Sequence, residues 1–369
     1  MSDRLRVGVI FGGRSGEHEV SLMSARSVLD ALDPQRYTIV PIGIAKDGRW
    51  YAGPGVLEAL QRGDAAGLMP ATLGFEPGRR GLYRWQSGET LERLAELDLV
   101  FPVTHGTFGE DGTLQGLLEM ADIPYVGCGV LASSVAMDKA LFKQVMRDHG
   151  IPVLESALIQ AERIAGAPQA ALDEAEAVAP YPLFVKPANL GSSVGVSKCR
   201  SRSDLLEGLI DAARYDRRVL VERGVEGREI EVSVLGNEQP EASVVGEIVP
   251  SDDFYSYRAK YIDDASGLLI PAPIDDETAG QVRRLAVEAF QAIDGAGMAR
   301  ADFLLERSSG RLYLNELNTI PGFTRISMYP KLWNASGVAY PELMDRLIEL
   351  ALRRQAQKDA LLRTYGGAG

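Results

Sequence analysis

The first third of the chain alternates short apolar runs with helical stretches, and this alternation constrains the fold more than any other feature. Apolar runs at residues 7–11, 38–44 and 97–101 have the length of buried strands, and a helical pattern follows Gly16. Such alternation is typical of an α/β unit with a parallel sheet. Residues 50–96 interrupt it with an irregular stretch rich in Gly, Pro and charge, which predicts a lid or surface insertion.

The rest of the chain has a different pattern, because strands dominate from residue 183 onward. Strands are expected at residues 183–187, 218–222, 230–235, 242–249, 298–305 and 312–317. The short spacing of the first four predicts antiparallel pairing. Helices are expected at residues 114–121, 131–149, 160–179, 277–293 and 340–356. With 369 residues, the chain should form two or three domains.

The charge balance and the cysteines indicate which binding partners and which cellular compartment are expected. The 39 basic and 51 acidic residues give a net charge of -12, which disfavours nucleic acid or an anionic membrane as a partner. No 18 apolar residues occur in succession, and the run at 7–11 is too short for a signal peptide. Cys128 and Cys199 have no metal-binding spacing, which is typical of a reducing compartment. The sequence therefore predicts a cytoplasmic protein.

Two segments near the C-terminus place polar side chains at strand spacing. Residues two apart on a strand share a face, so Arg300 and Asp302 point one way, as do Glu316 and Asn318. If these strands pair, Asp302, Glu316 and Asn318 form an all-oxygen cluster that suits Mg²⁺. The alternative is a hydrogen-bonded polar patch on an exposed sheet face.

A lysine and a flexible loop form the second candidate site. Lys186 lies near the end of an expected strand, and the Gly/Ser loop, Gly191-Ser192-Ser193-Val194-Gly195, follows it. A point charge beside exposed backbone N–H groups suits a polyphosphate. The loop is not a Walker A motif, and a plain β-hairpin turn is the alternative.

The first expected strand leads into a glycine-containing turn that opens a helix. Its glycines at 12, 13 and 16 do not have the spacing of a dinucleotide-binding fingerprint. Glu17 would repel a pyrophosphate but suits a cationic ligand, such as the ammonium of an amino acid. His105 precedes another Gly-rich turn, in which Thr113 is a candidate helix cap. This histidine either contacts the substrate or has a structural role.

Two further segments carry candidate contacts. Glu222 ends an expected strand and Glu229 follows a short linker, so the two carboxylates either bracket a ribose and an adenine amine or lie on a solvated hairpin. The loop at residues 319–328 directly follows the candidate metal ligands. In this loop the N–H of Gly322 is suited to meet an oxyanion beside Arg300.

Taken together, these segments resemble the D-alanine:D-alanine ligases, a family of the ATP-grasp superfamily. The resemblance runs from Gly8 to about Leu350, and its segments occur in the family's order. They are residues 17–21, 105–116, 137–139, 186 with 191–195, 259–261 and 315–328. The resemblance implies a three-domain ATP-grasp fold of the α/β and α+β class. Its parts would be an N-terminal parallel-sheet domain at 1–128, a central subdomain at 129–222 and a C-terminal subdomain at 223–369 that carries the metal and substrate sites.

The resemblance also implies the reaction. The family joins two D-alanine molecules through a D-alanyl phosphate for peptidoglycan precursor synthesis, using ATP with two Mg²⁺ or Mn²⁺ ions and releasing ADP and phosphate. Cations that offset the charge gathered during phosphoryl transfer, and a closed loop that excludes water, make this mechanism chemically sensible. A homodimer is usual in such families.

Individual roles carry over from the family's motifs. Nucleotide contacts are implied for Lys139, Phe184, Lys186, Ser192, Ser193, Glu222, Arg223, Val225, Glu229 and Lys260. Metal ligands are implied to be Asp302, Glu316 and Asn318. Substrate contacts are implied for Glu17, His105, Arg300, Gly322, Ser327 and Met328. Catalytic roles are implied for Glu17, Ser192, Tyr261, Arg300 and Gly322. Among these, Ser192 and Tyr261 would link the Gly/Ser loop, anchored by Glu17, to a mobile loop that closes the site.

Tyr261 bears on the product, because relatives that make D-alanyl-D-lactate usually have a histidine at this position. The tyrosine favours the dipeptide, and a D-alanine:D-lactate ligase or another ATP-grasp carboxylate-amine ligase is the alternative. A regulatory nucleotide-binding module would show a gap among the lysines or metal ligands, and the sequence has none. A dehydrogenase would need the fingerprint spacing that the first turn lacks.

Overall fold

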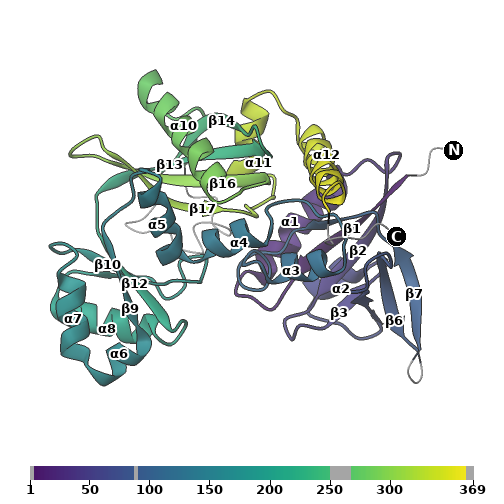
Figure 1. Ribbon diagram of the computed structural model, residues 1–369, viewed down its shortest axis with the longest axis horizontal. Coiled ribbons are helices and arrows are strands. Elements are labelled where there is room, and N and C mark those ends of the chain that lie inside the picture. Colours follow the sequence, from purple (N-terminus) through teal and green to yellow (C-terminus); the bar gives the residue numbers. More distant parts are fainter. Residues whose placement is uncertain (1–3, 87–89, 250–266, 363–369) are drawn as a thin grey trace.

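The computed structural model describes residues 4–86, 90–249 and 267–362 (Figure 1). Its N-terminal part contains a sheet with the strand order β4-β3-β2-β1-β8. These strands are β1 (Leu5–Gly12), β2 (Tyr37–Ile44), β3 (Trp50–Ala52), β4 (Met69–Pro70) and β8 (Leu99–Pro102). Strand β1 pairs in parallel with both β2 and β8, so the predicted parallel unit is confirmed.

Helices cover the N-terminal sheet on both faces. They are α1 (His18–Ala31), α2 (Val56–Gln61) and α3 (Thr113–Met120). Along β1, Val7 and Val9 pack into one core and Ile10 into another, as expected of a parallel strand that is buried on both faces. The predicted cap of α3 is wrong: Gly112, at φ 93°, precedes the helix, and Thr113 is its first residue. The positive φ of this turn suits glycine.

The predicted lid or surface insertion at residues 50–96 is wrong for residues 50–70, because β3 and β4 extend the N-terminal sheet and Val56 of α2 is buried in its core. Residues 71–96 form the insertion, and they are more regular than expected. Strands β5 (Thr72–Leu73), β6 (Gly81–Trp85) and β7 (Leu91–Glu96) make an antiparallel sheet at the flank of the N-terminal part (Figure 1). Leu73 and Leu82 are buried in the same core as Ile42 and Leu118. The insertion is therefore anchored by its own apolar side chains.

The middle part contains an antiparallel sheet with the order β11-β10-β12-β9. Its strands are β9 (Ser156–Gln160), β10 (Leu183–Pro187), β11 (Ser197–Cys199) and β12 (Arg218–Arg223). Helices α6 (Ala161–Gly166), α7 (Pro168–Glu176) and α8 (Arg202–Ala212) pack against it. The antiparallel pairing of residues 183–187 with 218–222 is confirmed, whereas β9, β11 and α8 were not predicted.

Two helices that were predicted as continuous are each broken in two. The segment 131–149 forms α4 (Val130–Met137) and α5 (Lys139–Asp148), because Asp138 adopts an extended backbone and its side chain accepts the N–H groups of Ala140 and Leu141 at 3.1 and 2.9 Å. The segment 160–179 breaks at Ala167, since a residue before proline avoids the helical backbone and Pro168 then starts α7.

The C-terminal part is built on a sheet with the order β15-β14-β13-β16-β17 (Figure 1). Its strands are β13 (Gly227–Gly236), β14 (Glu241–Val249), β15 (Gly267–Leu269), β16 (Gly297–Glu306) and β17 (Leu312–Asn318), and its helices are α10 (Asp276–Ala292) and α11 (Met328–Ala335). Helices α4 and α5 also pack here, since Ala132 and Phe142 share a core with Val232 and Leu314. The predicted boundary after residue 128 stays a prediction.

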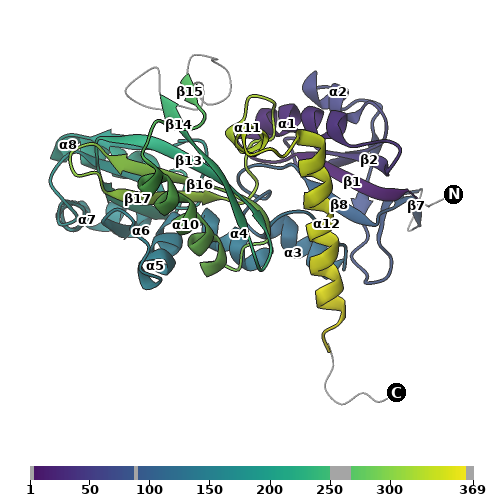
Figure 2. The same cartoon turned by 90° about the horizontal axis from the view of Figure 1, so that it is seen from above.

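The last helix, α12 (Tyr340–Asp359), returns to the N-terminal part. Leu343 and Leu347 share a core with Val7 and Phe101, and Figure 2 shows α12 lying across the N-terminal part beside α1 and β8. The N-terminal and C-terminal parts are thus joined by a common core. Among the helices in the described ranges, none is both long enough and apolar enough to cross a membrane.

Candidate active site

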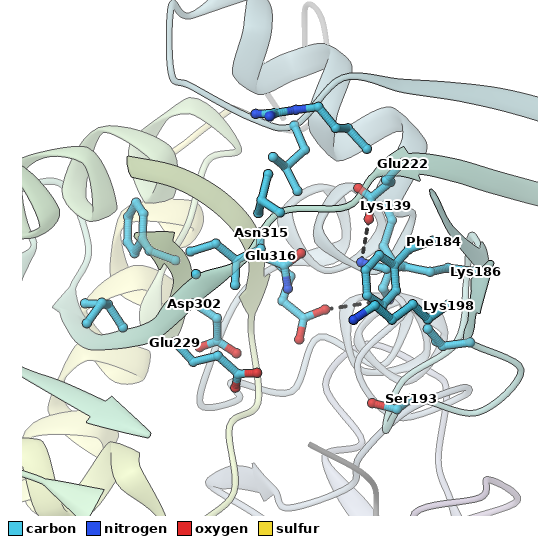
Figure 3. A pocket seen from close by; sticks show the side chains of 18 of the residues that line it. Lys139, Phe184, Lys186, Ser193, Lys198, Glu222, Glu229, Asp302, Asn315 and Glu316 are labelled. Atoms are coloured by element: carbon cyan, nitrogen blue, oxygen red, sulfur yellow. Dashed lines mark ion pairs between the residues drawn. The ribbon is translucent and has the colours of Figure 1, made fainter. Parts of the chain in front are cut away.

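A cleft of about 430 Å³ opens between the middle sheet and the C-terminal sheet. In Figure 3, Phe184, Lys186 and Lys198 lie on one side of this cleft, and Glu229 and Asp302 lie on the other. The predicted nucleotide and metal residues that line it are Lys139, Phe184, Lys186, Ser192, Ser193, Glu222, Arg223, Val225, Glu229, Asp302 and Glu316. Other lining residues were not predicted, among them the charged Lys198, Glu231 and Arg307. Lys260 and Tyr261 lie outside the described residues.

Lys139 lies at the first position of α5, where the break at Asp138 places it. Its Nζ donates to the carbonyl oxygen of Leu190, 2.7 Å away, just before the Gly/Ser loop. The same Nζ lies 3.8 Å from Oε2 of Glu316 on β17. Lys139 therefore connects the loop of the middle part with the acidic strand of the C-terminal part.

Glu222 is the centre of a buried charge cluster. Its Oε1 lies 2.6 Å from Nζ of Lys143, and its Oε2 pairs with Lys186. Burial by itself would raise the pKa of Glu222, but the two lysines outweigh it and hold this pKa at about 2. Lys143 was not predicted, although its place one helical turn after Lys139 puts both lysines on one face of α5.

The Gly/Ser loop reaches the N-terminal part. Ser192 Oγ donates a hydrogen bond to Oε1 of Glu17, whereas the predicted link of Ser192 to Tyr261 stays a prediction. Ser192 and Ser193 have φ of 52° and 59°, a backbone conformation that is uncommon for residues other than glycine. A Cβ at residue 191 would lie 2.8 Å from Oε2 of Glu17, so a larger residue there would displace this carboxylate.

Strands β16 and β17 pair as the sequence predicted, and they bring the acidic residues onto one face. Asp302 lies opposite Glu316, and Arg300 lies opposite Asn318. Both Oδ atoms of Asp302 accept hydrogen bonds from the Arg300 guanidinium at 2.6 Å, and Asn318 Nδ2 donates to Oδ2 at 3.0 Å. Glu231, the neighbour of Asp302 on β13, lies 3.0 Å from Arg300 Nε. Three adjacent strands therefore contribute a row of carboxylates.

The loop after β17 is held by residues of the N-terminal part. Its Ile320 accepts a hydrogen bond from His105 Nδ1 at 3.0 Å and donates its N–H to Oε2 of Glu110 at 3.3 Å. The other ring nitrogen of His105 lies 3.1 Å from Ser24 Oγ. Burial lowers the pKa of His105 and so favours the neutral ring. The negative charge of Glu17 offsets this effect only in part. Because both ring nitrogens have partners, direct substrate contact by His105 stays a prediction.

The remaining predicted substrate residues follow in the same loop and in α11. Gly322 lies close to Ser327, because a Cβ at residue 322 would lie 2.8 Å from Ser327 Oγ. Met328 is buried, and its side chain packs with Ile248 and Leu332. Only the backbone of Met328 is therefore suited to a polar contact.

A second cavity, of about 50 Å³, adjoins the larger cleft. The predicted residues that line it are Glu17, Lys139, Ser192, Arg300, Glu316 and Asn318. Glu110, which also lines it, has a pKa raised to about 8 by burial and by the nearby Glu17. The cavity thus brings together residues that the sequence assigned separately to an ammonium site, an oxyanion site and a metal site.

The donor set fits a hard divalent cation. Asp302 and Glu316 offer carboxylate oxygens from paired strands, and the amide of Asn318 already lies at hydrogen-bonding distance from Asp302. Mg²⁺ is bound by such oxygen ligands together with substrate phosphates. Across the cleft, Lys139, Lys186 and Lys198 place positive charge opposite these carboxylates, which suits a polyphosphate. The fold and this cleft between two antiparallel sheets define an ATP-grasp enzyme.

The comparisons with known proteins identify the family. The family models described as D-ala D-ala ligase N-terminus and C-terminus match residues 6–128 and 145–349. A D-alanine--D-alanine ligase of Thermoanaerobacter sp. (strain X514) is 49% identical over 96% of this chain and 99% of its own length. The D-alanine--D-alanine ligase A of Chromobacterium violaceum is 48% identical over 98% of this chain and 99% of its own length. The chain belongs to the D-alanine–D-alanine ligase family, whose members are ATP-using ligases that act on small molecules.

Solved structures agree with this assignment. The D-alanine-D-alanine ligase from Coxiella burnetii superposes with a TM-score of 0.82 at 38% identity, covering 99% of this chain and 98% of the other. The VanG D-Ala:D-Ser ligase from Enterococcus faecalis superposes with a TM-score of 0.83 at 36% identity, covering 95% of this chain and 100% of the other. The predicted family, fold class and enzyme class are therefore confirmed.

Proposed function

We propose that this chain, a ligase of the D-alanine–D-alanine family, joins two D-alanine molecules to D-alanyl-D-alanine for peptidoglycan precursor synthesis. ATP is consumed, and ADP and phosphate are released. The observation that carries the proposal is the small cavity that Glu17, Arg300, Glu316 and Asn318 line beside the lysine-bearing cleft. There, a carboxylate for an ammonium group lies next to groups suited to phosphoryl transfer.

In the first step, Glu17 holds the ammonium of the first D-alanine, and Arg300 with the N–H of Gly322 holds one oxygen of its carboxylate. The other carboxylate oxygen attacks the γ-phosphorus of ATP. The bond from this phosphorus to the β,γ-bridging oxygen breaks, and ADP leaves with the electron pair. Positioning and charge stabilisation account for most of the catalysis in such a transfer.

In the second step, the amine of the second D-alanine attacks the carbonyl carbon of D-alanyl phosphate. Arg300 and the N–H of Gly322 stabilise the oxyanion that forms, the amine loses a proton, and phosphate leaves as the carbonyl re-forms. Ser327 and the backbone N–H of Met328, at the start of α11, receive the second carboxylate. His105 borders the first D-alanine. It donates a hydrogen bond to the carbonyl oxygen of Ile320 and so positions the loop that contacts this substrate.

The nucleotide lies between the two sheets in this proposal. Lys139, Lys186 and Lys260 contact its phosphates, and Glu222 and Glu229 face adenine and ribose. Phe184, Ser192, Ser193, Arg223 and Val225 complete its site. Asp302, Glu316 and Asn318 would hold two Mg²⁺ or Mn²⁺ ions. Bound there, such ions neutralise charge on the phosphate oxygens. A hydrogen-bonded link between Ser192 and Tyr261, anchored by Glu17, closes the site against water.

Several broader features belong to the same proposal. The domains divide after residues 128 and 222, and the chain works as a cytoplasmic homodimer without a nucleic-acid or membrane partner. The net charge of -12 supports the absence of an anionic partner. Tyr261 favours D-alanine over D-lactate as the second substrate. The likeness to the VanG D-Ala:D-Ser ligase makes D-serine a further acceptor to compare.

The test is phosphate release from ATP measured with D-alanine, L-alanine, or D-alanine mixed with D-lactate or D-serine, followed by mass determination of the product. We expect release with D-alanine alone and a product with the mass of D-alanyl-D-alanine. Release that does not depend on D-alanine would contradict the ligase proposal. A product containing D-lactate or D-serine at neutral pH, in preference to the dipeptide of D-alanine, would contradict the proposed acceptor.

A further inference from the structure

The turn at residues 105–110 lies between two groups that the proposed reaction needs at a fixed separation. On one side it approaches Glu17, because a Cβ at Gly106 would lie 2.5 Å from Oε2 of Glu17. On the other side it contacts Ile320, two residues before Gly322. The turn therefore links the residue proposed for the ammonium of D-alanine with the loop proposed for the oxyanion.

Glu110 makes this link through its two carboxyl oxygens. Oε1 accepts the N–H of Gly106 at 3.0 Å, and Oε2 accepts the N–H of Ile320 at 3.3 Å. One side chain thus ties the turn to itself and to a loop of the C-terminal part. No sequence motif assigned a role to Glu110, and neither proposed reaction step uses it.

A second connection holds the other end of the same loop. His105 Nδ1 faces the carbonyl oxygen of Ile320, which only accepts, so Nδ1 carries the proton. In the neutral ring Nε2 then accepts from Ser24 O–H, which leaves Ser24 Oγ to accept the N–H of Phe323 at 3.3 Å. Ile320 and Phe323 are both held by N-terminal side chains, one on each side of Gly322.

We propose that Glu110 is a positioning residue for the ligase reaction, which fixes the N–H of Gly322 relative to Glu17 by holding Ile320 and Gly106 together. Ser24, which is hydrogen-bonded to His105, holds the loop on the other side of Gly322 by accepting the N–H of Phe323. This inference rests on the proposed function, because it assigns Gly322 to the oxyanion. Its physical basis is the steep dependence of catalysis on placement, since a displacement of about 1 Å costs on the order of 100-fold in rate.

The test uses the full chain with Glu110→Gln, which keeps the size of the side chain but replaces one accepting oxygen with an NH₂ group. We expect kcat for D-alanine-dependent phosphate release to fall about 100-fold, while the Kd for ATP, measured by calorimetry without D-alanine, stays within about twofold. Loss of both properties in parallel would indicate general damage and overturn the positioning role. Glu288→Gln, on the exposed side of α10, is the matched control and should change neither property.

Hydrogen exchange gives a readout that does not depend on activity. In Glu110→Gln, the peptide covering residues 319–323 or the one covering residues 104–108 should exchange faster than in the wild type, because the single amide oxygen can accept only one of the N–H groups of Ile320 and Gly106. Unchanged exchange in both peptides would overturn the proposed fixation, and faster exchange with kcat within threefold of the wild type would overturn its role in catalysis. Ser24→Ala, a smaller change at the other anchor, should lower kcat about tenfold. If the wild type releases no phosphate with D-alanine, the proposed function is wrong. The exchange experiment would still show whether Glu110 holds Ile320 and Gly106 in place.

Discussion

The two sheets that flank the cleft are attached to the N-terminal part in different ways. The C-terminal sheet is attached by α12, whose Leu343 shares a core with Val7, and by the loop in which Ile320 and Phe323 are held. The middle sheet has a separate core, formed by residues such as Leu183 and Val219. In the described ranges it meets Glu17 through Ser192 of a half-buried loop.

This difference divides the site into a fixed floor and a locally attached wall. The floor, made by the N-terminal and C-terminal parts, carries Glu17, Arg300 and Gly322. The wall, made by the middle part, carries Lys186, Glu222 and the Gly/Ser loop. Changes in the floor should therefore alter the chemical steps, whereas changes in the wall should alter its stability or its closure over the substrates.

The largest effect is expected from Arg300→Met in the floor. The proposed oxyanion loses its cationic partner, and Asp302 loses two hydrogen bonds of 2.6 Å. We expect kcat for phosphate release to fall about 1000-fold, the upper range for removal of one oxyanion donor. Arg284→Met, in an exposed pair with Glu288, should leave kcat unchanged. A kcat within tenfold of the wild type would remove Arg300 from the chemical steps.

In the wall, Glu222→Gln should have the largest effect on stability. It leaves the buried Lys143 and the half-buried Lys186 without their shared counter-charge, and breaking a buried ion pair typically costs about 3–5 kcal/mol in the free energy of unfolding. Urea unfolding at neutral pH measures this loss. Glu207→Gln, on the same part of the chain but outside the cluster, serves as the control.

The same variant should change the dependence of stability on pH. The pKa of Glu222 is lowered from 4.5 to about 2, so its stabilising contribution is present above pH 4.5 and is lost as the pH falls toward 2. The wild type should lose stability through this window more steeply than Glu222→Gln. Parallel curves for the two proteins would show that the ionised carboxylate does not stabilise the wall.

A smaller effect, confined to one substrate, is expected from Glu17→Gln. The ammonium of the first D-alanine loses a charged partner, so KM for D-alanine should rise about 10-fold to 100-fold. The Kd for ATP should not change, because the nucleotide cleft is lined by other residues. Glu19→Gln, two residues away and paired with Lys46 on the surface, is the matched control. If the Kd for ATP rose as much as the KM for D-alanine, Glu17 would not be specific to the D-alanine site, and the division into floor and wall would be wrong.

The smallest effect is expected from Ser192→Ala, which removes the hydrogen bond between the wall and Glu17. A loss of about 1.4 kcal/mol corresponds to a tenfold lower kcat/KM for D-alanine. The melting temperature should stay close to that of the wild type, since the middle sheet keeps its own core. Ser203→Ala, on an exposed face of α8, should change neither value. A large drop in melting temperature would mean that this contact supports the fold.

Local rules predicted much of the floor. Alternation along a strand placed Asp302, Glu316 and Asn318 on one face, and the pairing of β16 with β17 brought the carboxylates opposite each other. The parallel N-terminal unit followed from short apolar runs in the same way. The alternation depends on neighbours two residues apart, which a sequence pattern records directly, whereas the pairing of β16 with β17 entered the sequence analysis as a condition that the structure fulfils.

Contacts between distant segments could not be predicted in this way. Lys143 and Glu222 meet across two elements, and neither local pattern indicates the other. His105 has a residue type that suggests substrate contact, yet Ser24 and Ile320 occupy its ring nitrogens. The break at Asp138 had a local signal, the preference of aspartate for a helix N-cap, but the apolar pattern on both sides favoured one long helix.

The most direct test of the proposed mechanism uses D-alanine labelled with ¹⁸O in its carboxylate. An acyl phosphate intermediate transfers one labelled oxygen to each phosphate released, because the amine displaces the phosphate with its bridging oxygen attached. Mass spectrometry of the phosphate should therefore show one ¹⁸O per molecule, together with D-alanyl-D-alanine in equal amount. Unlabelled phosphate, formed while the dipeptide accumulates, would contradict the account.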